Sequence, residues 1–262
     1  MEFYGDYHVH CRASDGNQTV EEIAEVALQK GLKEVAVTDH GPLAAVIGVK
    51  NCDVYLQLRK KINEINSRDL GLKILLGAEA NVRDFKGTLD IDKEVMKSLD
   101  ILIIGLHPYT LPTSIADGLN LFLQNSLRHL GKKERAKAVK NNTIAIIEAL
   151  SRNPEVDILS HPGLFFNVDI EQVAEACRDN QVLFEINCGH EYPEISDIIK
   201  AERVGANFIV NSDSHFKKTV GDLKYGSKLV ESLGIKPERV VNSLHMGGNI
   251  EWKRKMITFK YS

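Results

Sequence analysis

At 262 residues, 43% hydrophobic and 26% charged, the chain has the composition of an ordinary soluble globular protein, with enough length for one α/β barrel rather than two domains. The formal net charge of −3 gives no overall attraction for nucleic acid, so we expect an enzyme of small-molecule chemistry rather than a nuclease. Residues 1–10 lack the basic flank and apolar core of a signal peptide, and no stretch reaches the roughly 18 to 20 apolar residues of a membrane span. We therefore expect a cytoplasmic protein without membrane contact.

The first apolar run, residues 1–9, ends at a pair of histidines. Because successive side chains of a strand point to opposite faces, His8 and His10 share one face and can aim two imidazoles at one point. Asp15 follows a few residues later. The ordinary alternative for a single H-x-H is two histidines on the polar side of an edge strand, so the interpretation depends on what recurs along the chain.

The same order of features repeats downstream: a short apolar run rich in β-branched residues, then a histidine or carboxylate, then a helical pattern. The first helix, over 20–30, begins at a capping box of Thr19 and Glu22. The later runs and the polar residues that end them are 34–38 with Asp39 and His40, 73–77 with Glu79, 100–106 with His107, 156–160 with His161, 182–186 with Asn187, and 207–211 with Asp213 and His215. Helices are predicted over 54–67, 142–150, 170–179 and 194–204, with closing helices plus a short apolar turn over 221–233 and 237–252. Seven strands alternating with helices predict parallel βαβ units.

One connection is much longer than the others. About fifty residues separate His107 from the next strand, far beyond the roughly 12 to 15 residues of an unstructured connection. Residues 109–140, here called the excursion, contain a helical pattern over 115–130 and a basic stretch over 128–140. We interpret the excursion as a lid or flanking element of a single domain spanning 1–262, with a solvated helical hairpin as the alternative.

The candidate ligands fall where parallel strands end. Strands closed into a barrel share one rim at their C-terminal ends, and barrel enzymes carry their chemistry on that rim. Structural histidines would have no reason to gather there. By contrast, His129 and His245 read as surface or packing residues, whereas His190 could reach the rim. The residues at the strand ends are His8, His10, His40, Glu79, His107, His161, Asp213 and His215.

These donors exceed the needs of one tetrahedral ion. Six imidazoles together with Asp15, Glu79 and Asp213 supply nine ligands, enough for two or three ions with positions left open for water. Glu79 is the best bridging candidate, because a carboxylate has two oxygens. A mixed nitrogen and oxygen shell suits zinc, manganese or iron(II) better than magnesium or calcium.

The motifs together resemble the polymerase and histidinol phosphatase (PHP) family, in particular its stand-alone bacterial phosphatase branch. The similarity runs from about residue 6 to 215, with weaker likeness to 242. The family implies a distorted seven-stranded (β/α) TIM-like barrel with a trinuclear metal site at the C-terminal rim. The motifs that carry the resemblance are His8-Val9-His10, Thr38-Asp39-His40-Gly41-Pro42, Gly77-Ala78-Glu79-Ala80-Asn81, Gly105-Leu106-His107, Ser160-His161-Pro162-Gly163, Glu185-Ile186-Asn187 and Ser212-Asp213-Ser214-His215.

The resemblance also assigns the ions, with zinc expected first and manganese or iron as alternatives. Some members supply a further histidine after the H-x-H, whereas this chain has Asp15-Gly16, so Asp15 takes that place. The excursion is longer than in the closest stand-alone branch, which leaves the substrate open. The implied sets are His8, His10, Glu79 and Asp213 for the first ion, Glu79, His107 and His161 for the second, and Asp15, His40 and His215 for the third.

The expected activity is hydrolysis of small-molecule phosphate monoesters through a metal-bound hydroxide, with Glu79, His107 and Asp213 as the catalytic ligands. Alternatives are a phosphatase specific for histidinol phosphate, a metal-dependent hydrolase that cleaves C–N bonds, and a non-catalytic module of a polymerase assembly. Arg12 lies close enough to the rim to contact phosphate, and Asp39 is expected to orient a ligating histidine. Basic residues of the excursion that could also meet an anion are Arg128, Lys132, Lys133 and Arg135.

Overall fold

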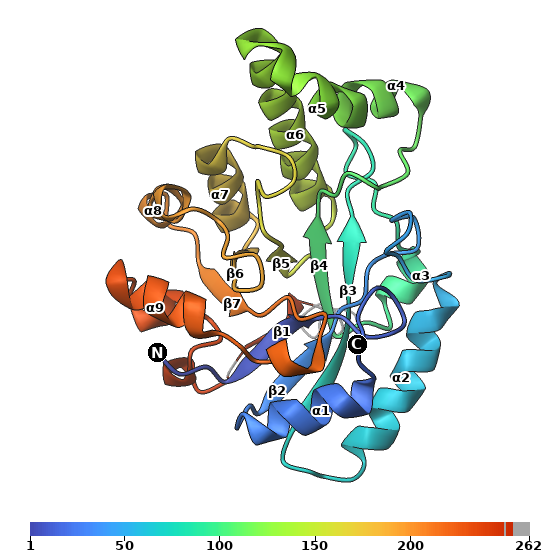
Figure 1. Cartoon of the computed structure of the whole chain (residues 1–262), viewed down its shortest axis with the longest axis vertical. Helices are drawn as coiled ribbons and strands as arrows, with labels where there is room; N and C mark the ends of the chain where they lie inside the picture. The colour runs from blue at the N-terminus through green and yellow to red at the C-terminus, as the bar shows by residue number, and fades with distance from the viewer. Residues whose placement is uncertain (249, 254–262) are drawn as a thin grey trace.

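The computed structural model describes residues 1–248 and 250–253, and within them seven strands follow one another in chain order around one sheet (Figure 1). Each strand pairs in parallel with the next, so that Val35 lies opposite Ile74 and Glu79 opposite Ile103. This arrangement confirms the predicted parallel βαβ units. The strands are β1 (Gly5–Val9), β2 (Glu34–Val37), β3 (Lys73–Asn81), β4 (Ile101–Gly105), β5 (Ile158–Leu159), β6 (Leu183–Asn187) and β7 (Phe208–Asn211).

The first and last strands meet and nearly close the barrel. Just after the C-terminal end of β1, the backbone N–H of His10 donates to the carbonyl of Ser214 at 2.9 Å. Nearer the base, the side chain of Asn242 spans the two strands: its Nδ2 donates to the Gly5 carbonyl at 3.0 Å and its Oδ1 accepts from the Val210 N–H at 3.1 Å. A side-chain amide thus supplies the hydrogen bonds that a complete ladder would provide.

Helices separate the strands along the chain, as the sequence predicts. The capping box is present, since Thr19 Oγ1 accepts from Glu22 N at 3.2 Å and Glu22 Oε2 accepts from Thr19 N at 2.9 Å. The buried face of the first helix includes Ile23 and Ala27. The helices are α1 (Val20–Gln29), α2 (Asp53–Asn66), α3 (Lys93–Met96), α6 (Lys132–Arg152), α7 (Ile170–Asp179), α8 (Ile195–Arg203) and α9 (Lys224–Ser232), and a 3-10 turn η3 (Lys217–Thr219) follows β7. None of the described helices combines the length and apolar character needed to cross a membrane.

Of the closing helices and short apolar turn predicted over 221–233 and 237–252, helical structure of more than one turn is wrong for the described residues of the second range, and residue 249 lies outside them. This segment forms two short 3-10 turns, η4 (Pro237–Arg239) and η5 (Leu244–Met246). Gly247 and Gly248 follow with φ of 65° and 71°, a left-handed backbone that ends helical structure.

The base of the barrel is filled by apolar side chains. Trp252 is buried there, and its ring centroid lies 4.9 Å from that of Tyr7. The backbone N–H of Lys253 donates to Asp157 Oδ1 at 2.9 Å, which fixes the segment that carries the tryptophan. The cluster consists of Tyr7, Ala36, Leu75, Ile101, Ile103, Ile158, Ile209 and Trp252. Apolar packing at this end leaves the opposite end of the barrel for polar side chains.

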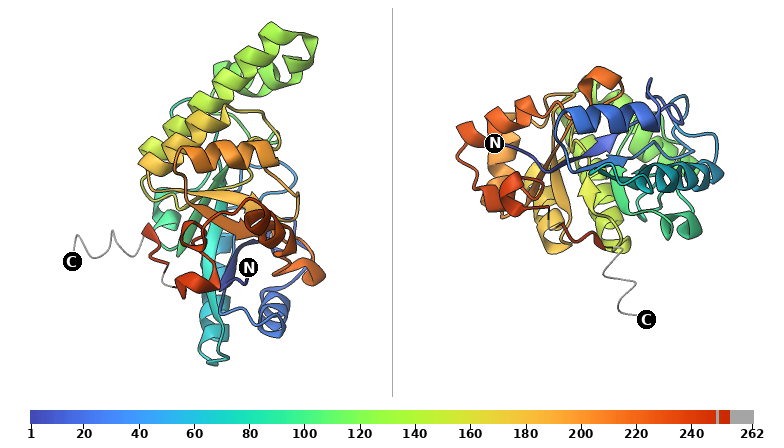
Figure 2. Two further views of the ribbon diagram at one scale, coloured as in Figure 1. Left: turned by 90° about the vertical axis from the view of Figure 1, so that its left-hand side faces the viewer. Right: turned by 90° about the horizontal axis from the view of Figure 1, so that it is seen from below.

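The excursion forms a helical arm. It comprises α4 (Ile115–Asp117), a π-helical turn η1 (Gly118–Leu123), α5 (Gln124–Leu127) and a 3-10 turn η2 (Arg128–Leu130), which confirms helical structure over 115–130. The arm projects from the end of the molecule toward which the arrows of β3 and β4 point (Figures 1 and 2). The next helix, α6, is longer than the predicted 142–150, because the basic stretch from Lys132 is rich in good helix formers.

Candidate metal centre

All nine predicted ligands meet at the C-terminal rim of the strands. His8 and Glu79 lie within β1 and β3, and the other residues follow directly after strands or in the first loop. Donor atoms of His8, His10 and Glu79 lie within 4.8 Å of one another, as do those of His40, Glu79 and His107. A further group within the same distance consists of His10, Asp15, His40 and His215. We call the nine residues the histidine–carboxylate cluster.

Glu79 lies at the middle of the cluster, and its two oxygens face different histidines. Oε1 lies 3.3 Å from His107 Nε2 and 3.1 Å from His161 Nε2. Oε2 lies 3.2 Å from His8 Nε2 and 3.0 Å from His40 Nδ1. A carboxylate placed in this way can serve two neighbouring cations at once.

The two aspartates lie on the other side of the cluster. Asp213 Oδ1 lies 3.2 Å from His10 Nε2. Asp15 Oδ2 lies 3.3 Å from His215 Nε2 and 3.8 Å from His40 Nε2, and Asp15 Oδ1 lies 3.7 Å from His10 Nδ1. His10 therefore faces both carboxylates. The side chains of Asp15 and His215 are 24% and 26% exposed, so this side of the cluster is the more open one.

Several buried donor atoms of the cluster have no hydrogen-bond partner among the described residues. They are Nε2 of His8, both ring nitrogens of His10, Nδ1 of His40 and Oε2 of Glu79, because the short separations of Glu79 Oε2 from His8 and His40 lack the angles of a hydrogen bond. A buried polar atom left unpaired costs about 1–3 kcal/mol, so this concentration at one place is unfavourable unless something binds there. Unpaired imidazole nitrogens around a carboxylate oxygen fit divalent transition-metal ions.

Four of the nine residues have protonation states that suit a cation even without metal, whereas neighbouring carboxylates outweigh burial and raise the pKa of His8, His40 and His161. Burial by itself would raise the pKa of the Glu79 and Asp213 carboxyls, but the surrounding imidazoles hold both well below the usual range. Burial lowers the pKa of His10 to about 3 and that of His107 to about 4. On the open side, burial works against protonation of His215, yet the neighbouring carboxylates raise its pKa to about 9. At pH 7, Glu79 and Asp213 are therefore anionic and His10 and His107 are neutral, which are the forms that bind metal.

Side chains behind the cluster orient its histidines, and sequence reasoning assigned them no role. His8 Nδ1 lies 2.7 Å from Glu185 Oε1, and His107 Nδ1 lies 2.7 Å from Asn81 Oδ1. Asn81 in turn donates from Nδ2 to Asp90 Oδ2 at 2.6 Å. These bonds fix the ring orientations so that each Nε2 faces Glu79. A glutamate inside the buried strand β6 was the signal in the sequence that could have found Glu185.

The carboxylates are oriented in a similar way. Asn187 Nδ2 donates to Asp213 Oδ2 at 2.9 Å, which leaves Oδ1 facing the histidines. Ser160 Oγ donates to Glu79 Oε1 at 2.6 Å. Two cluster residues also have left-handed backbones, with φ of 27° at His161 and 49° at Asp213. Non-glycine residues in this region of φ are held there by their surroundings, a feature concentrated at functional sites.

The interpretation of Asp39 as the partner of a ligating histidine is wrong. Its carboxylate accepts from Cys11 N at 2.9 Å and from Ser14 N at 3.2 Å. The side chain points toward the loop after β1 because that loop returns past the end of β2. Asp39 therefore fixes the segment that carries Asp15.

Of the other residues named from the sequence, His190 reaches the rim, where its Nε2 lies 3.5 Å from Asp213 Oδ2. Arg12 donates from Nε to the Asn17 carbonyl at 3.1 Å, and its guanidinium lies 3.8 Å from Glu22, so its contact with phosphate stays a prediction. His129 and His245 are exposed, as expected.

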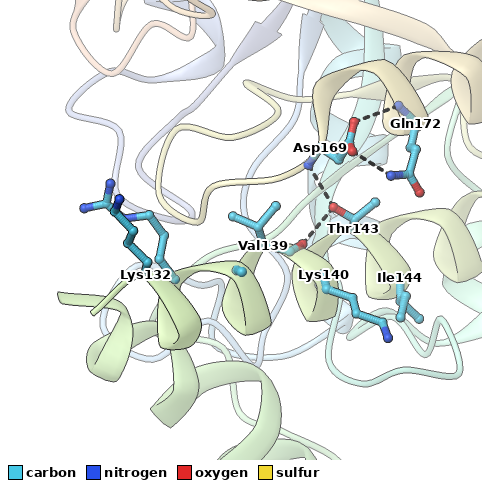
Figure 3. Close-up of a pocket in the computed structure, with 9 residues that line it drawn as sticks. Lys132, Val139, Lys140, Thr143, Ile144, Asp169 and Gln172 are labelled. Atoms are coloured by element: carbon cyan, nitrogen blue, oxygen red, sulfur yellow. Dashed lines mark hydrogen bonds between the residues drawn. The ribbon is translucent and has the colours of Figure 1, made fainter. Parts of the chain in front are cut away.

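Of the four basic residues that the sequence offered as anion contacts, two line a separate hollow of about 510 Å³ between α6 and the start of α7 (Figure 3). The two are Lys132, which lies at one end of this hollow in Figure 3, and Arg135. At the other end, Thr143 Oγ1 accepts from the Asp169 N–H at 2.8 Å. None of the nine cluster residues lines it, so these two cations are not directed at the cluster.

Comparison with known proteins identifies a family and several phosphatases that this chain resembles. The PHP domain family matches residues 6–192 of the chain. A protein of Caldanaerobacter subterraneus subsp. tengcongensis named "Probable phosphatase" is 32% identical over 250 residues, which cover 91% of this chain and 86% of that protein. One of the same name from Acetivibrio thermocellus is 30% identical over 252 residues, covering 93% and 92%. Among solved structures, histidinol phosphate phosphatase from Lactococcus lactis subsp. lactis, complexed with zinc, L-histidinol and phosphate, has the same fold, with a TM-score of 0.61 at 16% identity over 90% of this chain and 95% of that one.

Proposed function

This chain belongs to the PHP domain family, and we propose that it is a metal-dependent phosphatase that hydrolyses small-molecule phosphate monoesters at a site for three divalent ions. The observation that carries the proposal is the position of Glu79. Its two oxygens face two sets of buried imidazoles, and several of the ring nitrogens there have no hydrogen-bond partner among the described residues.

The contacts support three overlapping sets of ligands. Glu79 would be shared between the first two sets, because its two oxygens face ring Nε2 atoms of both. Zinc is the first ion to test, since the L. lactis relative contains it, and manganese and iron(II) are the alternatives. The sets are His8, His10, Glu79 and Asp213; Glu79, His107 and His161; and Asp15, His40 and His215.

Bound divalent ions would neutralise the phosphate oxygens and lower the pKa of water near phosphorus. The residues of the chain supply the geometry. Glu185 and Asn81 hold two imidazoles by their Nδ1 atoms, so that Nε2 stays directed inward. Asp15 and His215 border the open side, through which a phosphate ester would enter, and Arg12, in the same loop as Asp15, is the candidate for an additional phosphate contact.

The excursion is proposed to influence which ester is accepted. It is linked to the loop after β5 that begins at His161, since Asn125 Nδ2 donates to Asn142 Oδ1 at 2.7 Å, and Asn142 Nδ2 donates to the Asn167 carbonyl at 2.8 Å. The ring of Phe122 in the arm lies 6.1 Å from that of Phe166 in the same loop. A change in the arm would therefore reach the rim through this loop.

Purified protein should be assayed for bound metal and for phosphate release from a panel of monoesters, histidinol phosphate among them. More than one ion per chain together with metal-dependent phosphate release is the expected result. A folded preparation that never binds more than one ion under zinc, manganese or iron loading would contradict the three-ion site. Release of ammonia from C–N substrates, or metal binding with no hydrolysis of any ester, would instead favour one of the two other classes considered from the sequence.

A further inference from the structure

One phenylalanine lies directly against the histidine–carboxylate cluster. The ring centroid of Phe165 lies 5.5 Å from that of His107 and 5.4 Å from that of His161. The ring centroid of His190 lies 6.0 Å from that of Phe165, with the ring planes at 77°, an edge-to-face arrangement. Phe165 is only partly buried, and the side chain of His190 is 43% exposed. These two rings form a continuous surface beside the second ligand set, which we call the aromatic wall.

Both residues of the aromatic wall are held in place from outside the cluster. Phe165 is followed by Phe166, which is buried and packs on the ring of Phe122 in the excursion. The backbone N–H of His190 donates to Asn187 Oδ1 at 3.0 Å. The wall is therefore a preorganised surface, and a ligand that covers it gives up little conformational entropy of the protein.

The aromatic wall differs in chemistry from the rest of the rim. The cluster offers imidazoles and carboxylates, which suit ions and phosphate oxygens, whereas Phe165 offers an apolar ring face to whatever adjoins the phosphate. In a phosphate monoester that neighbour is the alcohol. We propose that Phe165 and His190 bind the leaving alcohol and select esters in which it carries a planar ring, a specificity that rests on the phosphatase function proposed above.

Two esters of matched leaving-group chemistry test the proposal. Benzyl phosphate and cyclohexylmethyl phosphate both release a primary alcohol, and they differ in whether the ring is planar and aromatic. Their phosphonate analogues, which cannot be hydrolysed, report binding by calorimetry independently of turnover. The variants are Phe165→Ala, Phe165→Leu, which keeps apolar volume without a ring, and Phe165→Tyr, which keeps the ring. Metal content and circular dichroism of each variant establish that the cluster is intact.

We expect the wild-type protein and Phe165→Tyr to favour the benzyl compounds. In Phe165→Ala and Phe165→Leu, benzylphosphonate should bind about 3- to 10-fold more weakly and the KM for benzyl phosphate should rise by a similar factor. The KM for glycerol phosphate should change less than about 2-fold, because a small polyol has no ring to pack on the face of Phe165. Ester hydrolysis by the wild-type protein with no preference for the benzyl compounds would contradict the ring selectivity of the aromatic wall. An equal preference in folded, metal-loaded Phe165→Leu would contradict it as well. Both results would leave the proposed phosphatase function intact. Ring-selective, Phe165-dependent phosphonate binding without any ester hydrolysis would support the wall and contradict the phosphatase function.

Discussion

Replacement of Glu79 by glutamine tests the centre of the proposed site most directly. Glu79→Gln keeps the shape of the side chain and removes the charge that faces imidazoles on both sides. One full charge acting across the 3.1 Å contact with His161 corresponds to about 5 kcal/mol at an effective dielectric constant of about 20. If that contribution is lost from the transition state, kcat/KM should fall by about 10³- to 10⁴-fold. The same change should lower the number of bound ions, because both sets of ligands lose their shared anion.

The assay combines phosphate release with elemental analysis of the same preparation. Glu34→Gln is the matched control, because Glu34 is also a buried glutamate of the barrel but lies at the opposite end. There its Oε2 accepts from the Tyr7 hydroxyl at 3.0 Å, and its Oε1 lies 3.2 Å from Lys73 Nζ. We expect Glu34→Gln to retain metal and activity. Near-normal turnover and metal content in folded Glu79→Gln would refute the bridging role.

Four further outcomes are expected. Asn81→Ala, which frees Nδ1 of His107, should weaken metal binding about 10- to 100-fold, as measured by competition with a chelator, and unchanged affinity would show that the bond is dispensable. Trp252→Ala should lower the free energy of unfolding by about 3–5 kcal/mol in urea titrations without changing kcat, whereas a change below 1 kcal/mol would mean that the base of the barrel tolerates a cavity. In metal-free protein, the pKa of His215 is raised to about 9, so its contribution to stability should be fully present below about pH 6.5 and lost as the pH rises through 9; His215→Gln should remove that part of the pH dependence. Replacing 114–137 by a Gly/Ser linker should change the ranking of substrates and their KM values more than metal content, and an unchanged ranking would place specificity elsewhere on the rim.

Local patterns in the sequence determined the architecture and the list of candidate ligands. Apolar runs alternating with helical patterns predicted the parallel βαβ units, the family resemblance implied that they form a barrel, and the capping box of Thr19 and Glu22 predicted where the first helix begins. The candidate ligands were found because each stands at the end of a run, and parallel strands bring such positions to one rim. The structure places them together, while their roles as metal ligands stay a prediction. Family membership was also accessible, because ordered motifs survive where overall identity is low.

Only the tertiary structure decided how these residues are supported. Glu185 bonds to His8 although 177 positions separate them, and Asn242 joins β1 to β7 across the gap in the barrel. Such partners depend on strand register and barrel closure, which no local period encodes. Asp39 was misassigned for the same reason, since its partners Cys11 and Ser14 belong to the loop after a different strand. The position of Trp252 in the base of the barrel could not be predicted either, because a single aromatic residue forms no periodic pattern in the sequence. Its burial against Tyr7 is seen only in the folded barrel.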